Sequence, residues 1–288
     1  MSTRRLLPLE GFLPDKIHVR ASFERVATRY EEAAFLQREI GDRLIERLDE
    51  VRLSPTRILD LGSGPGAGTR ALTQKYPNAH IIAVDLAVGM LREAQKLKDN
   101  SDFVCADVES LPFSSECVDL IHSNLTLQWC LDLAKTCTEA RRVLRPEGLF
   151  TFTTFGPDTL RELRTAWQSV EDGHAHVNAF VDMHDIGDLL AHAGFSGIVM
   201  DVEHITVTYP DMFGLMRDLK QLGAHNVTQG RPRHLTSRGT FQRLAAAYEN
   251  FRYEGRLPAT YEVIYGHGWA IPSVCKEARN HFKCNNGG

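Results

Sequence analysis

The sequence predicts an α/β fold in which a doubly wound, mostly parallel seven-stranded sheet carries an added helical lid. Between residues 57 and 143, short apolar runs alternate with helical patterns, and each run is too apolar on both faces for a half-exposed antiparallel sheet. The first run ends in a glycine-dense loop at 62–66, and a helical pattern follows that loop. At 288 residues, the chain suits one elaborated domain over 1–288.

The glycine loop is expected to lie open to a small ligand, because glycine permits φ > 0 and close approach to the backbone. Gly62-x-Gly64-x-x-Ala67 also satisfies the relaxed dinucleotide pattern, so the loop by itself leaves a nicotinamide or flavin cofactor open. The second apolar run, 81–85, ends in Asp85. An acid about 20 residues beyond such glycines suits a ribose diol.

Two further strands end in polar motifs. The third, 101–106, is followed by Asp107-Val108, and the fourth, 117–123, is followed by Asn124-Leu125. This ordered set resembles the class I S-adenosylmethionine-dependent methyltransferases, which implies S-adenosylmethionine as methyl donor in place of a dinucleotide. In that family the acid of the pair meets the adenine amino group and its apolar neighbour packs on the ring. The resemblance gives these cofactor-binding residues: Tyr30, Asp60, Gly62, Gly64, Gly66, Asp85, Leu86, Asp107, Val108, Asn124 and Leu125.

The other expected elements follow in chain order. An amino-terminal helical cap covers 18–50, and the resemblance places Tyr30 of this cap toward the cofactor. The cofactor-binding core covers 51–155, with helices at 88–97 and 134–143, a turn at 145–148 and a fifth strand at 149–155. Beyond it we expect a helix that Asp158 caps, a helix at 182–193 closed by Gly194, a strand at 197–209, helices at 212–222 and 237–250, and a strand at 259–269.

Two of these segments are additions to a minimal doubly wound sheet. Ligands bind outside the carboxyl ends of the strands in such sheets. We therefore interpret 156–180 and 210–257 as helical insertions that cover the substrate, and we expect the polar tail 271–288 to be flexible.

Composition limits the classes of function. A net charge of −4 argues against a general nucleic-acid binder, yet 211–256 holds eight arginines and lysines against four acids. The six cysteines show no paired or zinc-like spacing, so no metal is predicted. The apolar run near the amino terminus is too short for a signal peptide, and no run of 18 apolar residues could span a membrane. These observations favour the cytoplasm over a mitochondrial location and predict no membrane partner.

The added segments sharpen the resemblance. The motifs at 155–163, 176–180, 219–224 and 258–261 resemble the malonyl-acyl-carrier protein O-methyltransferases of biotin synthesis, and Ser22-Phe23 with Tyr30 and Gln37 agrees. The resemblance implies methylation of the free carboxylate of a malonyl thioester, preferably on acyl-carrier protein, to give the methyl ester that primes pimeloyl synthesis. The last two motifs also resemble a complex I assembly factor reported as an arginine hydroxylase. That activity, a methyltransferase for another small carboxylate, and a non-catalytic cofactor-binding factor are the alternatives.

The reaction sets what the site needs. A carboxylate with a pKa of about 4 is ionised at neutral pH, so no catalytic acid or base is predicted. The substrate carboxylate does need a partner, and the planar arginine fork matches its two oxygens. The candidates on the added segments are Arg161, Arg164, Arg217, Arg231 and Arg233. Acyl-carrier proteins are acidic, so the basic segment 211–256 is a candidate docking surface.

Overall fold

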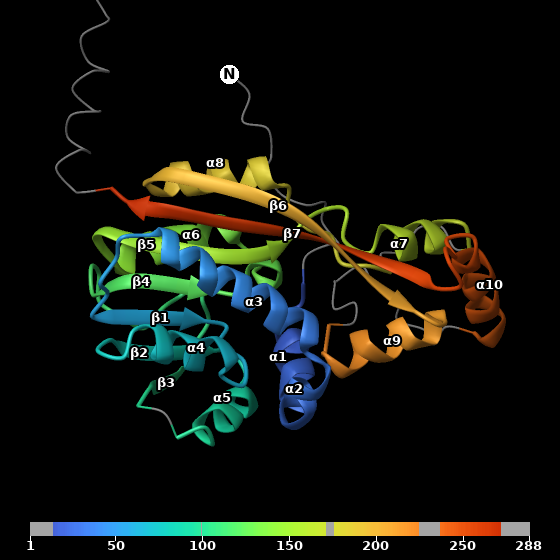
Figure 1. Ribbon diagram of the computed structural model, residues 1–288, viewed down its shortest axis with the longest axis horizontal. Helices are drawn as coiled ribbons and strands as arrows, with labels where there is room; N and C mark the ends of the chain where they lie inside the picture. The colour runs from blue at the N-terminus through green and yellow to red at the C-terminus, as the bar shows by residue number, and fades with distance from the viewer. Residues whose placement is uncertain (1–13, 99, 171–175, 225–236, 272–288) are drawn as a thin grey trace, which may run out of the picture.

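The computed structural model describes residues 14–98, 100–170, 176–224 and 237–271, and a seven-stranded sheet forms its centre (Figure 1). The strands are β1 (Arg57–Leu61), β2 (His80–Asp85), β3 (Asp102–Cys105), β4 (Val118–Ser123), β5 (Leu144–Phe155), β6 (Phe195–Tyr209) and β7 (Leu257–Ala270). Their order in the sheet is β3-β2-β1-β4-β5-β7-β6, with β7 antiparallel to both neighbours and the other pairs parallel. The predicted mostly parallel seven-stranded sheet is confirmed.

Helices cover both faces of the sheet because the strands are apolar on both. In β1, Ile58 and Leu59 point to opposite faces and join different hydrophobic clusters. Ile58 packs in the cluster that includes Leu72 of α4 (Ala67–Lys75), whereas Leu59 packs in the cluster that includes Ile186 of α8 (Met183–Ala193). Two more helices complete the layers, α5 (Val88–Gln95) beside β2 and β3 and α6 (Leu133–Val143) beside β5.

The amino-terminal cap is helical, but it is broken into pieces that the sequence analysis did not foresee. They are α1 (Lys16–Val26), η1 (Ala27–Arg29), α2 (Tyr30–Ala33), α3 (Phe35–Arg47) and η2 (Leu48–Glu50). The two halves of the cap bury their apolar residues against different partners. Val26 packs with Met90 of α5, whereas Ile40 joins the cluster of the added helices, so the chain turns between them.

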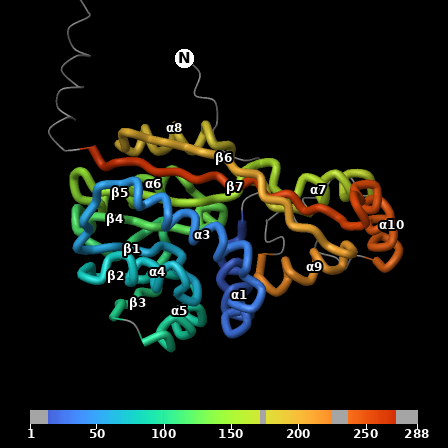
Figure 2. Tube along the Cα trace, in the orientation of Figure 1, coloured from blue at the N-terminus to red at the C-terminus, as the bar shows by residue number. Residues whose placement is uncertain are grey.

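Strands β6 and β7 extend beyond the rest of the sheet, and three helices gather around their far ends (Figure 1). These helices are α7 (Arg161–Gln168), α9 (Met212–Gln221) and α10 (Arg238–Glu249). Leu163, Leu215 and Leu244, one from each helix, share a hydrophobic cluster with Tyr261 of β7. The end of α9 lies beside α1 (Figure 2). There the Ser22 hydroxyl of α1 donates to the carbonyl of Gly223, which follows α9, at 3.0 Å.

Two local predictions are corrected. Residues 145–148, expected as a turn before the fifth strand, lie within β5 as an irregularity between the Val118–Leu144 and Leu120–Leu149 pairs. Asp158 does not cap α7: that helix follows Leu160, which has φ 55°, and its start carries no side-chain cap. The Asp158 carboxylate lies instead 3.9 Å from Arg161 and 3.7 Å from His204, and the Asp158 N–H donates to the Glu262 carboxylate at 2.6 Å.

Other boundaries agree with the sequence. Asp182 accepts a hydrogen bond from the His184 N–H at the start of α8, and Gly194 ends that helix with φ 97°. The flexible tail predicted for 271–288 lies outside the described residues, apart from Ile271. Among the helices of the described ranges, none is both long and apolar enough to cross a membrane.

Candidate functional site

Three neighbouring hollows lie at the carboxyl ends of the parallel strands, beneath the amino-terminal helices. The inner pocket lies among α1, the glycine loop and the ends of β2 and β4. The outer cavity lies between α1, α7 and α9, and the loop pocket lies between α3 and α4 beside Asp60. Gln37 lines all three, and Gln128, Trp129 and Phe155 line both the inner pocket and the outer cavity.

Most of the residues expected to bind the cofactor meet in one place. The inner pocket is lined by Tyr30, Gly62, Gly64, Asp85, Leu86, Asp107, Val108, Asn124 and Leu125. Asp60 and Gly66 are not among its lining residues. The pattern was informative because parallel strands end at one edge, so motifs far apart in the chain converge there.

The glycine loop uses its glycines for different reasons. Gly62 has φ 69°, and a Cβ there would lie 2.0 Å from Thr126 Oγ1, so packing excludes any side chain. Gly64 has φ 55°, but a Cβ there would meet nothing within 4 Å. Gly64 therefore leaves room at the wall of the inner pocket, which fits a ligand that approaches the backbone closely.

Gly66 has a structural role at the start of α4. Its φ is 95° immediately before α4, and a Cβ there would lie 3.0 Å from the Ala94 Cβ on α5. The positive φ and this close approach to α5 favour glycine here. Its expected contact with the cofactor stays a prediction.

Asp85 holds the loop from the end of β2. Its carboxylate accepts the Gly64 N–H at 2.9 Å and the Ala87 N–H at 2.8 Å. Burial raises the pKa of Asp85 to about 6, although these two backbone hydrogen bonds oppose the rise. When ionised, this pocket-lining carboxylate can accept hydrogen bonds from ligand hydroxyl groups.

Asp107 has a partner that the sequence analysis missed. Lys16 of α1 forms ion pairs with Asp107 and with Glu109, the latter at 2.7 Å. Burial lowers the pKa of Lys16, but its hydrogen bonds to the two carboxylates outweigh that effect and leave the pKa raised. Lys16 thus ties α1 over the inner pocket. No sequence signal marked it, because 91 positions separate Lys16 from Asp107.

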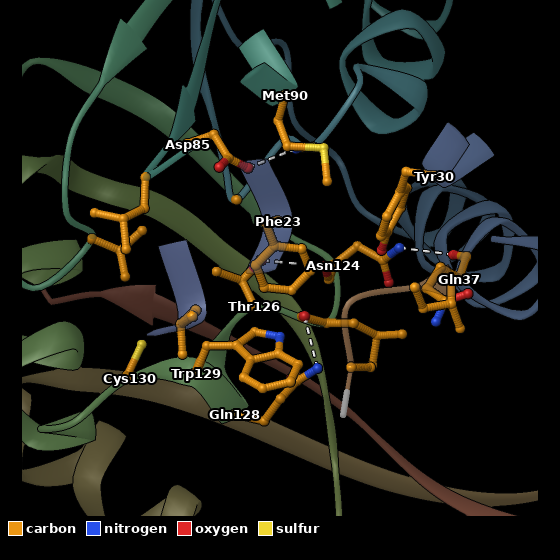
Figure 3. A pocket seen from close by; sticks show the side chains of 18 of the residues that line it. Phe23, Tyr30, Gln37, Asp85, Met90, Asn124, Thr126, Gln128, Trp129 and Cys130 are labelled. Atoms are coloured by element: carbon orange, nitrogen blue, oxygen red, sulfur yellow. Dashed lines mark hydrogen bonds between the residues drawn. The ribbon is translucent and has the colours of Figure 1, made fainter. Parts of the chain in front are cut away.

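Aromatic rings close the same pocket. Phe23 meets Trp129 edge to face, with ring centroids 5.4 Å apart, and it contacts Tyr30 at 6.3 Å (Figure 3). Burial raises the pKa of Tyr30 well above its usual range, so the phenol stays neutral. These three rings form an apolar wall of the inner pocket, and Trp129 also lines the outer cavity.

Asp60 anchors the loop from behind. It is buried and accepts a hydrogen bond from Thr69 Oγ1 at 2.7 Å, and His122 Nδ1 lies 2.8 Å from it. Because Thr69 belongs to α4 and His122 to β4, Asp60 fixes both elements relative to β1. It lines the loop pocket, which shares Gly62 and Gly64 with the inner pocket.

The arginine candidates differ in whether they line one of the three hollows. Arg217 lines the outer cavity and is exposed at its rim. Arg164 donates to the Pro157 and Thr159 carbonyls at 2.7 and 3.0 Å, and burial lowers its pKa. Arg161 has a 56% exposed side chain, and neither Arg161 nor Arg164 lines any of the three hollows. Arg231 and Arg233 lie outside the described residues.

Two basic residues at the rim were missed because they lie outside the basic segment. Arg25 and Arg29 of the amino-terminal cap face the outer cavity together with Arg217 and Lys220 of α9. We call these four residues the basic rim. By contrast, Arg252 of the basic segment is bound to Glu249 and to the Pro210 and Gly255 carbonyls.

The described residues also contain a group with metal-ligand chemistry. Ligand atoms of Asp158, His204 and Glu262 lie within 4.8 Å of one another. Asp158 and His204 are exposed, and Glu262 already accepts the Asp158 N–H. None of these three residues lines the hollows described above.

The chain is similar to known proteins in sequence and in fold. A family model described as "Methyltransferase domain" matches residues 59–152. The YcgJ protein of Bacillus subtilis superposes with a TM-score of 0.57 at 15% identity, covering 81% of this chain and 100% of that one. The phosphoethanolamine N-methyltransferase 2 of Haemonchus contortus, in complex with S-adenosyl-L-methionine, superposes with a TM-score of 0.54 at 15% identity, covering 86% and 57%.

Closer relatives align with this chain along about nine-tenths of its length. A malonyl-acyl-carrier protein O-methyltransferase from Methylovorus sp. (strain MP688) is 48% identical over 269 residues, which cover 90% of each chain. The protein of the same name from Laribacter hongkongensis is 49% identical over 271 residues, which cover 90% of this chain and 91% of that one.

The sheet, the glycine loop and the pocket at the carboxyl ends of the strands define a class I methyltransferase. Within that class, the chain belongs to the malonyl-acyl-carrier protein O-methyltransferase family.

The raised pKa of Asp85 predicts pH-dependent cofactor binding. Hydroxyl donors of a bound ribose favour the ionised carboxylate, so binding should lower a pKa that is about 6 in the free protein. Affinity is then full above that pKa and falls as the pH drops through it. We expect the Kd for S-adenosylhomocysteine to rise roughly tenfold between about pH 8 and pH 5. Calorimetry at several pH values measures this, and a flat profile would contradict the assignment.

Asp85→Asn is the matched variant for this experiment. The amide cannot ionise over this range, so the variant should bind more weakly at high pH and lose the pH dependence. An unchanged pH profile in Asp85→Asn would place the titrating group elsewhere.

Proposed function

We propose that this protein transfers a methyl group from S-adenosylmethionine to the free carboxylate of a malonyl thioester, preferably one held on an acyl-carrier protein. The observation that carries the proposal is the identity of about half with malonyl-acyl-carrier protein O-methyltransferases along nine-tenths of the chain. The inner pocket, which borders a larger cavity with a basic rim, supports the same reading.

The residues of the inner pocket fit the methyl donor. Gly64 leaves room beside the loop, and the Asp85 carboxylate suits ribose hydroxyl groups. Asp107 and Val108 suit the adenine ring, with Lys16 holding the Asp107 carboxylate. When bound, S-adenosylmethionine supplies an electrophilic methyl group on a positively charged sulfur.

Methyl transfer requires that the carboxylate oxygen, the methyl carbon and the sulfur are aligned and that water is excluded. The carboxylate oxygen forms the new O–CH₃ bond while the S–CH₃ bond breaks and leaves its electron pair on sulfur, so no proton moves. Because the nucleophile is already ionised, the protein needs no general base. Its contribution is to hold the oxygen in line at near-attack distance in a dry site, and Trp129 and Phe155, which line both hollows, suit that task.

The outer cavity suits a long thioester arm. Its walls come from the cap, from the insertions at 156–180 and 210–257, and from β7, and they include Leu163, Trp167 and Tyr261. The basic rim at its mouth complements an acidic carrier protein. We therefore infer that the carrier docks at the basic rim and that its arm enters between α1 and α9.

Methyl transfer from labelled S-adenosylmethionine to malonyl-acyl-carrier protein tests the function. We expect label as a base-labile ester on malonyl-acyl-carrier protein, less on malonyl coenzyme A, and none on acetyl-acyl-carrier protein, which has no free carboxylate. Absence of label on all malonyl substrates while cofactor binding is intact would refute the proposal. Label on the acetyl carrier would show a nucleophile other than the carboxylate.

A further inference from the structure

Gln37 lies where the inner pocket meets the outer cavity, a place that Arg161, Arg164 and Arg217, the arginine candidates among the described residues, do not occupy. It lies in the first turn of α3 and lines the inner pocket, the outer cavity and the loop pocket. Its backbone carbonyl accepts the Asn124 amide N–H at 2.8 Å (Figure 3). Asn124 in turn accepts from Thr153 Oγ1 at 2.6 Å, so Gln37 is fixed relative to both β4 and β5.

The side chain of Gln37 has hydrogen-bonding capacity left over. Its amide oxygen is buried and has no hydrogen-bond partner in the part of the chain that the structure describes. The neighbouring amide of Gln128 is committed, since it donates to the Leu125 carbonyl at 2.8 Å and accepts from Thr154 Oγ1 at 3.2 Å. Asn178 Oδ1 is also buried without a partner among the described residues, but Asn178 lines the outer cavity and neither of the other two hollows. A buried polar atom without a partner costs free energy, so such an atom at the meeting of two ligand sites points to a ligand as its partner.

The chemistry of the two ligands matches the two ends of an amide. An ionised carboxylate only accepts hydrogen bonds, so it can pair with the amide nitrogen and not with the amide oxygen. The methyl donor carries positive charge, which suits the amide oxygen. A neutral amide also holds the carboxylate less tightly than an arginine would, and it therefore stabilises less of the negative charge that disappears in the transition state.

We propose that Gln37 orients the malonyl carboxylate against the methyl donor, with its amide nitrogen on the carboxylate and its amide oxygen toward the cationic end of the donor. This assignment rests on the proposed function. It gives an amide the task for which the sequence analysis sought an arginine.

Two substitutions separate this role from a structural one. Gln37→Leu removes both polar ends at similar size, and Gln37→Glu keeps the size but replaces the donor with a negative charge. For Gln37→Leu we expect kcat/KM with malonyl-acyl-carrier protein to fall roughly 10- to 100-fold and the Kd for S-adenosylmethionine to rise. For Gln37→Glu we expect a fall of at least that size, because two carboxylates repel, while the Kd stays equal or decreases.

Opposite effects on donor binding and methyl transfer in Gln37→Glu are the decisive readout. Calorimetry gives the Kd without turnover, and Gln95→Leu on the exposed surface of α5 is the matched control. Parallel losses of binding and activity in both Gln37 variants would indicate a structural role and overturn the inference. Retention of parental activity by Gln37→Glu would also overturn it.

The parent protein separates this failure from that of the proposed function. If the parent methylates malonyl-acyl-carrier protein and Gln37→Glu does so equally well, only the role of Gln37 is refuted. If the parent methylates no malonyl thioester, the proposed function fails and the inference fails with it.

Discussion

Gly62→Ala is expected to lower the free energy of unfolding by about 3 kcal/mol, which sums left-handed backbone strain and overpacking. The backbone at Gly62 has φ 69°, and the new Cβ would lie 2.0 Å from Thr126 Oγ1 and 2.7 Å from the Thr126 Cβ. The Thr126 hydroxyl cannot easily move, because it donates to the Leu61 carbonyl at 3.1 Å. Urea denaturation of the two proteins measures the difference.

Gly64→Ala is the matched control. Its φ of 55° carries similar backbone strain, but its Cβ would meet nothing within 4 Å, so we expect a loss of only about 1 kcal/mol. The same Cβ would enter the wall of the inner pocket, so Gly64→Ala should weaken cofactor binding more than stability. Equal losses of stability in the two variants would contradict the packing argument.

A second substitution tests the named contact. Thr126→Ala removes the two atoms that would lie nearest to the new methyl group, at 2.0 and 2.4 Å. The double variant should therefore recover part of the stability that Gly62→Ala loses. Additive losses would show that Thr126 is not the cause.

Reversing charge at the basic rim is expected to raise the KM for malonyl-acyl-carrier protein roughly 10- to 100-fold at low salt. The double variant Arg29→Glu/Arg217→Glu changes both sides of the cavity mouth, one on the cap and one on α9. The effect should shrink as salt screens the exposed charges. Steady-state kinetics at several salt concentrations measure it.

The controls for this experiment address charge and substrate. Arg52→Glu/Arg92→Glu makes the same change in net charge at exposed positions away from the hollows and should leave KM unchanged. A small malonyl thioester without a carrier should respond little to the rim variants. An equal rise in KM for the small thioester would indicate direct binding of the carboxylate by the arginines instead of docking.

Local chemistry made much of the fold predictable. The buried strands and their order in the chain follow from apolar runs of strand length, and the bounds of α8 follow from Asp182 and Gly194. The carboxyl-end motifs at Asp85 and Asp107 were predictable as one site, because parallel strands deliver their ends to one edge.

Sequence patterns did not predict the positions of residues that are held by contacts distant in the chain. Asp158 is bound by Glu262, 104 positions away, its carboxylate lies near His204, and α7 begins only after Leu160, so its local signal for a helix cap was misleading. The substrate-site candidates were drawn from the added segments, but Arg25, Arg29 and Gln37 come from the cap before the first strand. Their positions depend on how the cap breaks and folds back, which no periodicity in the sequence encodes.

The sequence by itself therefore determined the doubly wound sheet and the glycine loop, because each depends on residue types at short spacing. The class of cofactor followed from the resemblance of the ordered motifs between Gly62 and Leu125 to a known family. Only the tertiary structure decided that Lys16 meets Asp107, that Gln37 borders all three hollows, and that the basic rim draws on both the cap and α9. The physical reason is that these contacts join elements whose relative placement follows from packing of the whole core, and packing is a property of the assembled fold.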